Sequence, residues 1–204
     1  MSNGKLIVLA LACLGAAGPG LAADFSDPTW PCIQRKVEDL SLGLMWPYQV
    51  VDGETAENST DIDEIAGLLA LRRIELEDLR PQVAEFAARY NGDPDILGQV
   101  FQRVFDTLSK RRKHIIAGIG EFSLKQIDLA EKIDLARVEM DQALSSDPPD
   151  HDRVDALEEQ LDWDQLIYSD RQRSITYLCE TPQIIERRLF AISQMLQQLT
   201  SDQG

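Results

Sequence analysis

The segment Asp147-Pro148-Pro149-Asp150 divides the longest helix-periodic part of this chain into two arms. Each proline lacks an amide donor and pushes the residue before it out of the α region, so a helix has to end here. The surrounding residues, 145–152, are otherwise polar, as is usual for an exposed turn. Because a short turn joins antiparallel neighbours, the two arms are predicted to form one helical hairpin.

Apolar residues recur at steps of three and four along both arms, from Leu97 to Ala143 and from Val154 to Leu199. This spacing places them on one face of each helix. Positions equidistant from the centre of the turn should face each other, and most of these pairs are apolar on both sides. Ile133 opposite Asp164 is the one poor match. The matched pairs are Met140 with Leu157, Ala136 with Leu161, Leu129 with Tyr168, Phe122 with Ile175, Ile119 with Leu178, Leu108 with Leu189, and Phe101 with Leu196, together with the polar pair Gln126 and Arg171.

A third, shorter helix is predicted over residues 60–90. Thr60 and the acids that follow it favour a helix start. The pair Asn91-Gly92 is typical of a helix end. Pro81 is expected to kink this helix. The short link that follows makes it an antiparallel neighbour of the first arm.

The expected fold is therefore all-α. A long antiparallel coiled-coil hairpin packs with the shorter third helix as a three-helix bundle at one end, and together they make up residues 60–204. Each arm has about 50 residues and would be about 75 Å long if fully helical. Residues 123–170, around the tip at 147–150, should project from the bundle by about 35 Å. Pro182 predicts a kink or a short break in the second arm.

Residues 1–23 resemble a secretory signal peptide. Lys5 supplies a positive start, residues 6–17 form an apolar core, and small residues precede position 24. An uncleaved membrane anchor and a lipidated Cys13 are the alternatives, although the apolar run is short for a membrane span. We expect a periplasmic or secreted protein, exported by a bacterium through a cleavable signal peptide.

Cleavage would leave two of the three cysteines, Cys32 and Cys179. An even pair in an exported chain predicts a disulfide bond. Two buried free thiols are the alternative. Neither cysteine belongs to a Cys-x-x-Cys motif that would indicate redox catalysis.

Residues 24–59 have a different composition, because Trp30 and Trp46 each stand directly before a proline. We interpret this segment as an extended strap that packs on the hairpin, with one short helix near residues 34–40. Packing in the core is the preferred role for both tryptophans, and an aromatic platform for a ligand is the alternative.

Two glycines inside the first arm, Gly118 and Gly120, are expected to form the notch that receives the strap. A glycine inside a helix costs about 1 kcal/mol relative to alanine, so a packing reason is expected. We place Trp30 over both glycines, with Cys32 bonded to Cys179.

The chain carries a formal net charge of −15. Residues 128–170 contain fourteen acidic and three basic side chains, so the projecting part of the hairpin is strongly negative. A solvated coiled-coil surface explains this charge, and a docking arm for a basic partner or for divalent cations is the alternative. Such a chain is not expected to bind nucleic acid, which requires a basic surface.

Basic residues gather instead in the middle of the hairpin. They are expected either to pair with acids of residues 61–78, such as Glu75, Glu77 and Asp78, or to bind an anionic partner. Phospholipid headgroups, and hence a membrane surface, or an acidic protein would be such a partner. The candidate patch consists of Arg103, Lys110, Arg111, Arg112, Lys113, Arg187 and Arg188.

Signals for an enzyme are poor in the sequence, and an enzyme ranks last among the functions considered. The two histidines, His114 and His151, belong to no set with metal-ligand spacing. There is no glycine-rich phosphate loop and no nucleophile elbow. We therefore expect a non-enzymatic protein without a cofactor or metal, which binds another protein through its acidic arm as an adaptor. A periplasmic chaperone or stress protein and a small-molecule binding domain are the alternatives, and a homo-oligomer stays open.

Overall fold

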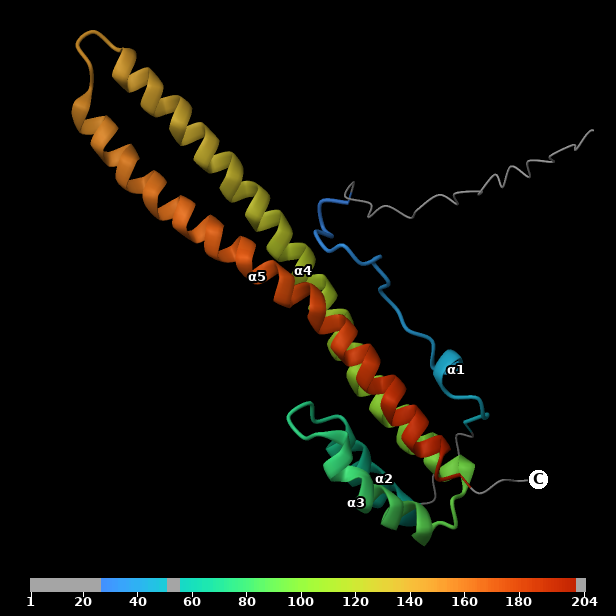
Figure 1. Ribbon diagram of the computed structural model, residues 1–204. Coiled ribbons are helices and arrows are strands. Elements are labelled where there is room, and N and C mark those ends of the chain that lie inside the picture. The colour runs from blue at the N-terminus through green and yellow to red at the C-terminus, as the bar shows by residue number, and fades with distance from the viewer. Residues whose placement is uncertain (1–26, 51–55, 201–204) are drawn as a thin grey trace, which may run out of the picture.

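The computed structural model describes residues 27–50 and 56–200. The predicted signal peptide lies outside the described residues. Among the described residues there are five α-helices and no strand: α1 (Leu42–Met45), α2 (Ala56–Leu69), α3 (Leu76–Arg89), α4 (Pro94–Ser145) and α5 (His151–Gln197). The all-α prediction is confirmed (Figure 1). None of the described helices combines the length and the apolar character that a membrane crossing requires.

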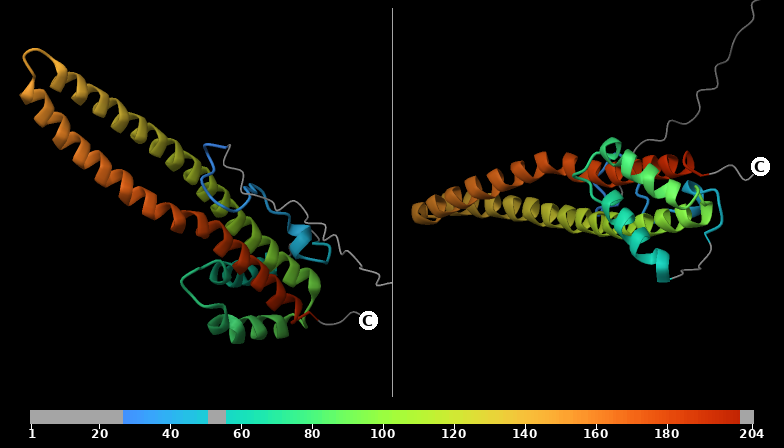
Figure 2. Two further views of the ribbon diagram at one scale, coloured as in Figure 1. Left: turned by 45° about the horizontal axis from the view of Figure 1, so that its top comes forward. Right: turned by 90° about the horizontal axis from the view of Figure 1, so that it is seen from below.

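The predicted hairpin consists of α4 and α5, which are 52 and 47 residues long. They would extend about 78 Å and 70 Å, and Figures 1 and 2 show them running antiparallel to the turn at their far end. An aspartate caps the start of each helix. The carboxylate of Asp93 accepts a hydrogen bond from the Asp95 amide at 2.8 Å, and that of Asp150 accepts one from the Arg153 amide at 3.0 Å.

The α5 helix is continuous through Pro182, so the short break that the sequence allowed there is absent. Pro182 is buried. A helix that packs on both sides of a proline can continue across the missing amide donor, because tertiary contacts hold the neighbouring turns in place.

Apolar clusters along the hairpin agree with the predicted facing pairs. In the distal half, Ile133, Ala136, Leu157 and Leu161 form a separate buried cluster, flanked by Leu129, Met140 and Tyr168. This cluster contains both members of the three facing pairs predicted nearest the tip.

The carboxylate of Asp164, which was predicted to face Ile133, is paired with a neighbouring lysine. Asp164 is buried, and the ammonium group of Lys132 lies 2.9 Å from its carboxylate. The neighbour of Ile133 in the sequence therefore supplies the counter-charge. The predicted polar pair is different as well, because Gln126 donates a hydrogen bond to the Tyr168 carbonyl at 2.8 Å rather than bonding to Arg171.

The single helix predicted over residues 60–90 is wrong: α2 and α3 are separate helices. The chain breaks after Leu69, where the Arg188 guanidinium donates hydrogen bonds to the carbonyls of Leu69 and Leu71 at 2.9 and 2.8 Å. The first of these bonds satisfies the Leu69 carbonyl, which is left unpaired at the end of α2, whereas the Leu71 carbonyl also accepts a hydrogen bond from the Ile74 amide. Pro81, where a kink was expected, lies within α3 and does not end that helix.

The base of the molecule therefore has four helices instead of three. Side chains from α2, α3, α4 and α5 share one buried core, which includes Leu69, Phe86, Phe101 and Leu189. The end of α3 is as predicted, because Asn91 and Gly92 have positive φ angles of 53° and 64° and the Gly92 amide bonds back to Ala87.

The strap, residues 27–50, lies along one side of the lower half of the hairpin, and α2 and α3 lie along the other (Figures 1 and 2). No helix forms over residues 34–40, and the short α1 follows later in the chain. The carbonyls of Gln34 and Glu38 accept hydrogen bonds from the side chains of Trp30 and Arg112, so a local helix would compete with them. The predicted boundary at residue 59 also shifts, since α2 begins at Ala56.

Candidate functional site

A disulfide bond fastens the strap to the middle of the hairpin. Cys32 is bonded to Cys179 with a Cα–Cα distance of 5.5 Å, as the sequence predicted. Around this bond Trp30 packs in a small apolar cluster with Ile116 and Ile119. The disulfide is compatible with export to an oxidising compartment.

Above the disulfide, polar groups hold the N-terminal end of the strap. The Ser123 hydroxyl donates a hydrogen bond to the Pro28 carbonyl at 2.7 Å. Hydrogen bonds from the Thr29 hydroxyl and amide lower the pKa of Asp27, with a further contribution from the positive charge of Lys36. Within the described residues, this is the farthest point along the hairpin at which the strap forms a hydrogen bond with it.

The predicted glycine notch is only half correct. At Gly120 an added Cβ would lie 3.4 Å from both the Cβ and the carbonyl oxygen of Thr29, so the strap does pass closely there. At Gly118 such an atom would meet nothing within 4 Å, so Trp30 does not cover this glycine. Gly118 is on an exposed face of α4. A side chain at position 118 would therefore not be crowded at its Cβ, and the prediction that Gly118 forms part of the notch is wrong.

The glycine that lies beneath a tryptophan is Gly98, which sequence reasoning did not single out. An added Cβ at this position would lie 3.1 Å from the indole nitrogen of Trp46. Trp46 is 2% exposed and stacks on Phe101 with ring centroids 5.3 Å apart. The signal was available, because Gly98 lies one helical turn before Phe101 on the apolar face of α4. Trp46 thus belongs to the core of the base.

The basic patch predicted from the sequence separates into paired and unpaired members. Arg103 is paired with Asp63 of α2, and Lys113 with Asp39 of the strap at 2.9 Å. Arg188 caps the end of α2. Burial lowers the pKa of the Arg188 guanidinium, and the charge of Glu75 opposes that shift.

Arg112 is the one buried arginine among the described residues of this patch, with 3% of its surface exposed. Its guanidinium forms an ion pair with Glu186 of α5 and donates a hydrogen bond to the Glu38 carbonyl of the strap at 3.1 Å. One side chain therefore joins α4, α5 and the strap. The expected partner Glu77 is not involved, because it pairs with Arg80 at 2.9 Å.

The three remaining basic residues, Lys110, Arg111 and Arg187, are exposed. Within the described residues none of them makes an ion pair or a hydrogen bond. The patch is thus partly a set of internal ties between the strap and the hairpin. The unpaired remainder could meet an anion.

Two cavities flank the strap. One, of about 280 Å³, lies beside the disulfide, and we name it the disulfide cavity. The other, of about 310 Å³, lies between the strap and the outer face of α4, and we name it the strap groove. Residues that line the disulfide cavity include Trp30, Gln34, Arg35, Arg112, Glu186 and Arg187, and those that line the strap groove include Thr29, Lys36, Lys113, Ile116, Gly120 and Leu124.

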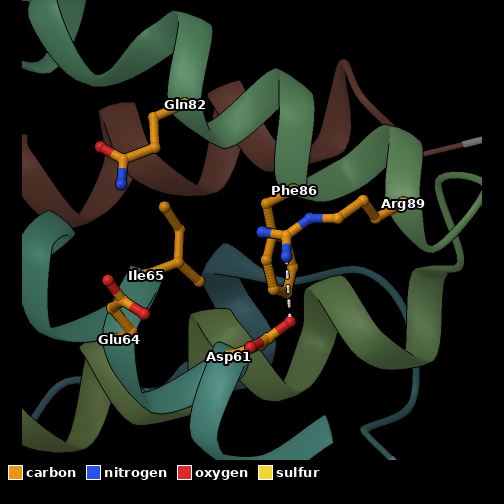
Figure 3. A pocket seen from close by; sticks show the side chains of 6 residues that line it. All are labelled: Asp61, Glu64, Ile65, Gln82, Phe86 and Arg89. Carbon is orange, nitrogen blue, oxygen red and sulfur yellow. Dashed lines mark hydrogen bonds and ion pairs between the residues drawn. The ribbon is translucent and has the colours of Figure 1, made fainter.

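A third and smaller cavity, of about 70 Å³, lies between α2 and α3 (Figure 3). Arg89 crosses this gap to Asp61 at 3.1 Å, with its guanidinium carbon 5.8 Å from the centre of the Phe86 ring. The Tyr90 hydroxyl donates to the same carboxylate at 3.0 Å. This cavity would hold a few water molecules at most, and its polar groups serve to join the two helices.

The distal half of the hairpin carries a line of exposed apolar side chains. On α4 these are Leu124, Ile127, Leu135 and Val138, which we name the outer stripe; they are 44 to 64% exposed. At about 100° per residue they share one face, on the side of α4 opposite Ile133 and Ala136. The line continues from the strap groove, because Leu124 also lines that groove.

A second exposed apolar group lies on α5. It includes Trp163, which is 62% exposed, and Leu166, Ile167 and Tyr177. Sequence reasoning described the arm by its charge and its internal stripe, and it missed both outer groups. Their spacing in the sequence could have revealed them, since each helix carries a second periodic set of apolar residues outside the set that faces the core.

No protein-family model, no curated protein and no solved structure matches this chain. Among the described residues, no group of three or more His, Cys, Asp or Glu side chains is placed to hold a metal ion. The case for function therefore rests on the surfaces of the molecule.

Proposed function

We propose that this chain is an exported, non-enzymatic protein that binds a basic, amphipathic helix of another protein along the distal half of its hairpin. The observation that carries the proposal is the outer stripe of α4, which no other described element covers. Single exposed apolar residues are ordinary on a protein surface, but a periodic line of them on a helix is typical of a docking face.

Charge favours a basic partner. Asp128, Glu131 and Asp134 are exposed beside or within the outer stripe. A partner helix with lysines or arginines around its apolar face would place opposite charges against these carboxylates. A second copy of the chain would bring like charges together, because residues 128–170 hold fourteen acidic and three basic residues in each copy.

The strap groove gives the partner helix a defined end. It joins the outer stripe at Leu124, and its wall includes Ile116 and Gly120 of the same helix. One large apolar side chain of the partner would fit here, as anchors fill pockets in helix-in-groove complexes. Export is supported by the Cys32–Cys179 bond and by the sequence of residues 1–23.

The test is site-specific photo-crosslinking in cells that export the protein. A photoreactive phenylalanine analogue at position 135 reports on the outer stripe, and the same group at position 155, on the exposed side of α5, is the control. We expect position 135 to label one protein, at a segment that is basic and amphipathic, and position 155 to label it much less.

Charge variants sharpen the test. Glu131→Lys with Asp134→Lys should weaken the crosslink from position 135, whereas Asp155→Lys with Asp162→Lys adds the same charge away from the stripe and should not. Labelling of many unrelated unfolded proteins would replace the proposal with a chaperone function. Labelling of a second copy alone would replace it with self-association.

A further inference from the structure

The disulfide cavity has an unusual wall for so acidic a protein. Arg35, Arg112 and Arg187 converge on it from the strap, α4 and α5, and Glu186 is the one acidic residue that lines it. The chain as a whole has a formal net charge of −15. Basic side chains therefore outnumber acidic ones on this wall, where an anion meets less of the general repulsion of the acidic chain.

Two of these arginines are available to a ligand. Arg35 and Arg187 are exposed, and within the described residues neither makes an ion pair or a hydrogen bond. Arg112 is buried and fixed by Glu186 and the Glu38 carbonyl, yet its Nε has no hydrogen-bond partner among the described residues. Arg112 therefore contributes fixed positive charge to the wall, whereas Arg35 and Arg187 supply exposed donors.

Gln34 of the strap also lines the cavity. The side-chain oxygen of Gln34 is buried and has no partner among the described residues. Neither this oxygen nor the Arg112 Nε exposes surface to the cavity, so the donors within reach of a ligand belong to Arg35 and Arg187. A phosphate group offers more acceptor oxygens to these guanidinium donors than a carboxylate does.

We propose that the disulfide cavity binds a phosphate group, held by Arg35 and Arg187 beside the fixed charge of Arg112. Guanidinium forks match the oxygens of phosphate and bind them with two parallel hydrogen bonds. With three arginines against Glu186, the wall has an excess of positive charge that suits a group carrying about −1.5 to −2 at neutral pH. Trp30 and Pro182 give the cavity apolar surface for the organic part of a phosphate ester.

The site depends on the disulfide. Trp30, Gln34, Arg35 and Val37 all come from the strap within five residues of Cys32, and the rest of the wall comes from the hairpin. The bond between Cys32 and Cys179 holds these two halves together. The phosphate site therefore exists only in the oxidised protein.

The test is calorimetric titration of the oxidised mature chain with inorganic phosphate and with glycerol 3-phosphate. It is accompanied by sedimentation with vesicles of phosphatidylglycerol, with phosphatidylcholine vesicles as the neutral control. We expect binding that weakens about tenfold or more in Arg187→Gln and in Arg35→Gln, since each removes a charged hydrogen-bond donor. Arg111→Gln is the matched control, because it removes an equal charge from an exposed arginine that does not line the cavity, and it should change the affinity less than twofold.

The two ligand sources give different results. Binding of the soluble phosphates assigns a small phosphate ester, whereas binding of phosphatidylglycerol vesicles alone assigns a lipid headgroup. Absence of binding to all of these probes would overturn the proposal, as would an equal loss in Arg111→Gln. Replacing both Cys32 and Cys179 with serine should weaken binding as much as Arg187→Gln does, and unchanged binding in that variant would also overturn it.

Discussion

Trp46 of the strap lies directly over Gly98 of α4, with its indole nitrogen 3.1 Å from the place where a Cβ of residue 98 would be. The indole cannot easily move away. It stacks on Phe101, and the carbonyl of the preceding residue, Met45, accepts hydrogen bonds from Ser193 and Gln197 at 2.6 and 3.1 Å. At the base of the molecule, the indole of Trp46 therefore occupies the space that a side chain at position 98 would fill.

Gly98→Ala and Gly118→Ala should have opposite effects on stability. Alanine at position 98 crowds Trp46, and overpacking of about 1–3 kcal/mol should exceed the gain of about 1 kcal/mol from helix propensity. Alanine at position 118 meets nothing and should stabilise by up to about 1 kcal/mol. Urea unfolding of both variants is the measurement, and a stabilised Gly98→Ala would show that the strap yields at Trp46.

Arg112→Gln should lower the free energy of unfolding by about 2–3 kcal/mol, because it leaves the Glu38 carbonyl and the Glu186 carboxylate without their donor. Arg111→Gln is the neighbouring control. Arg111 is exposed and makes no ion pair within the described residues, so its loss should change stability by less than about 0.5 kcal/mol. Equal effects of the two changes in chemical denaturation would contradict a special role for the buried guanidinium.

Tyr90 should titrate at unusually high pH. Burial raises its pKa above the ordinary 10.0, and the hydrogen bond to Asp61 and the charge of that carboxylate raise it further. A raised pKa in the folded state means that the neutral phenol stabilises the fold. This contribution is complete below pH 10 and is lost as the pH rises through the raised pKa.

Absorbance at alkaline pH measures this shift. The difference between the titration curves of the wild type and Tyr90→Phe isolates the Tyr90 phenol, and Asp61→Asn should move its midpoint to lower pH. A Tyr90 midpoint at or below pH 10 would rule out the contact with Asp61 in solution.

Reduction of the disulfide should expose Trp30 and leave Trp46 buried. Trp30 lies in the small cluster around Cys32, whereas Trp46 belongs to the large core of the base. Acrylamide quenching of two variants, each retaining only one of these tryptophans and both carrying Trp163→Phe, would follow them separately in the presence and absence of reductant. Equal exposure of both would mean that the strap detaches as one unit.

The hairpin could be predicted because its determinants are local and repeated. Two long helices with periodic apolar faces, joined by a double proline, can pack against each other in one register. The buried cluster around Ile133 and Leu157 follows from that register. The disulfide could be predicted by elimination, since only two cysteines lie outside the apparent signal peptide.

The remaining differences come from contacts between distant parts of the chain. The break after Leu69 depends on Arg188, which is 119 residues away and offers hydrogen bonds that a continuous helix would not use. The strap has no helix over residues 34–40 because Trp30 and Arg112 occupy backbone carbonyls there. Neither of these contacts produces a periodic pattern in the sequence. The sequence shows where basic side chains gather. Which of them form ion pairs depends on strap residues such as Asp39, and the sequence did not define the path of the strap.

The position of the two bonded cysteines in the chain also has a consequence for biosynthesis. Cys179 follows Cys32 by 147 residues, so a ribosome has made the strap, α2, α3, α4 and more than half of α5 before the partner thiol exists. The strap is among the first described segments to be synthesised and among the last that can be locked in place. A molecule that terminates before Cys179 therefore keeps the Cys32 thiol without its disulfide partner.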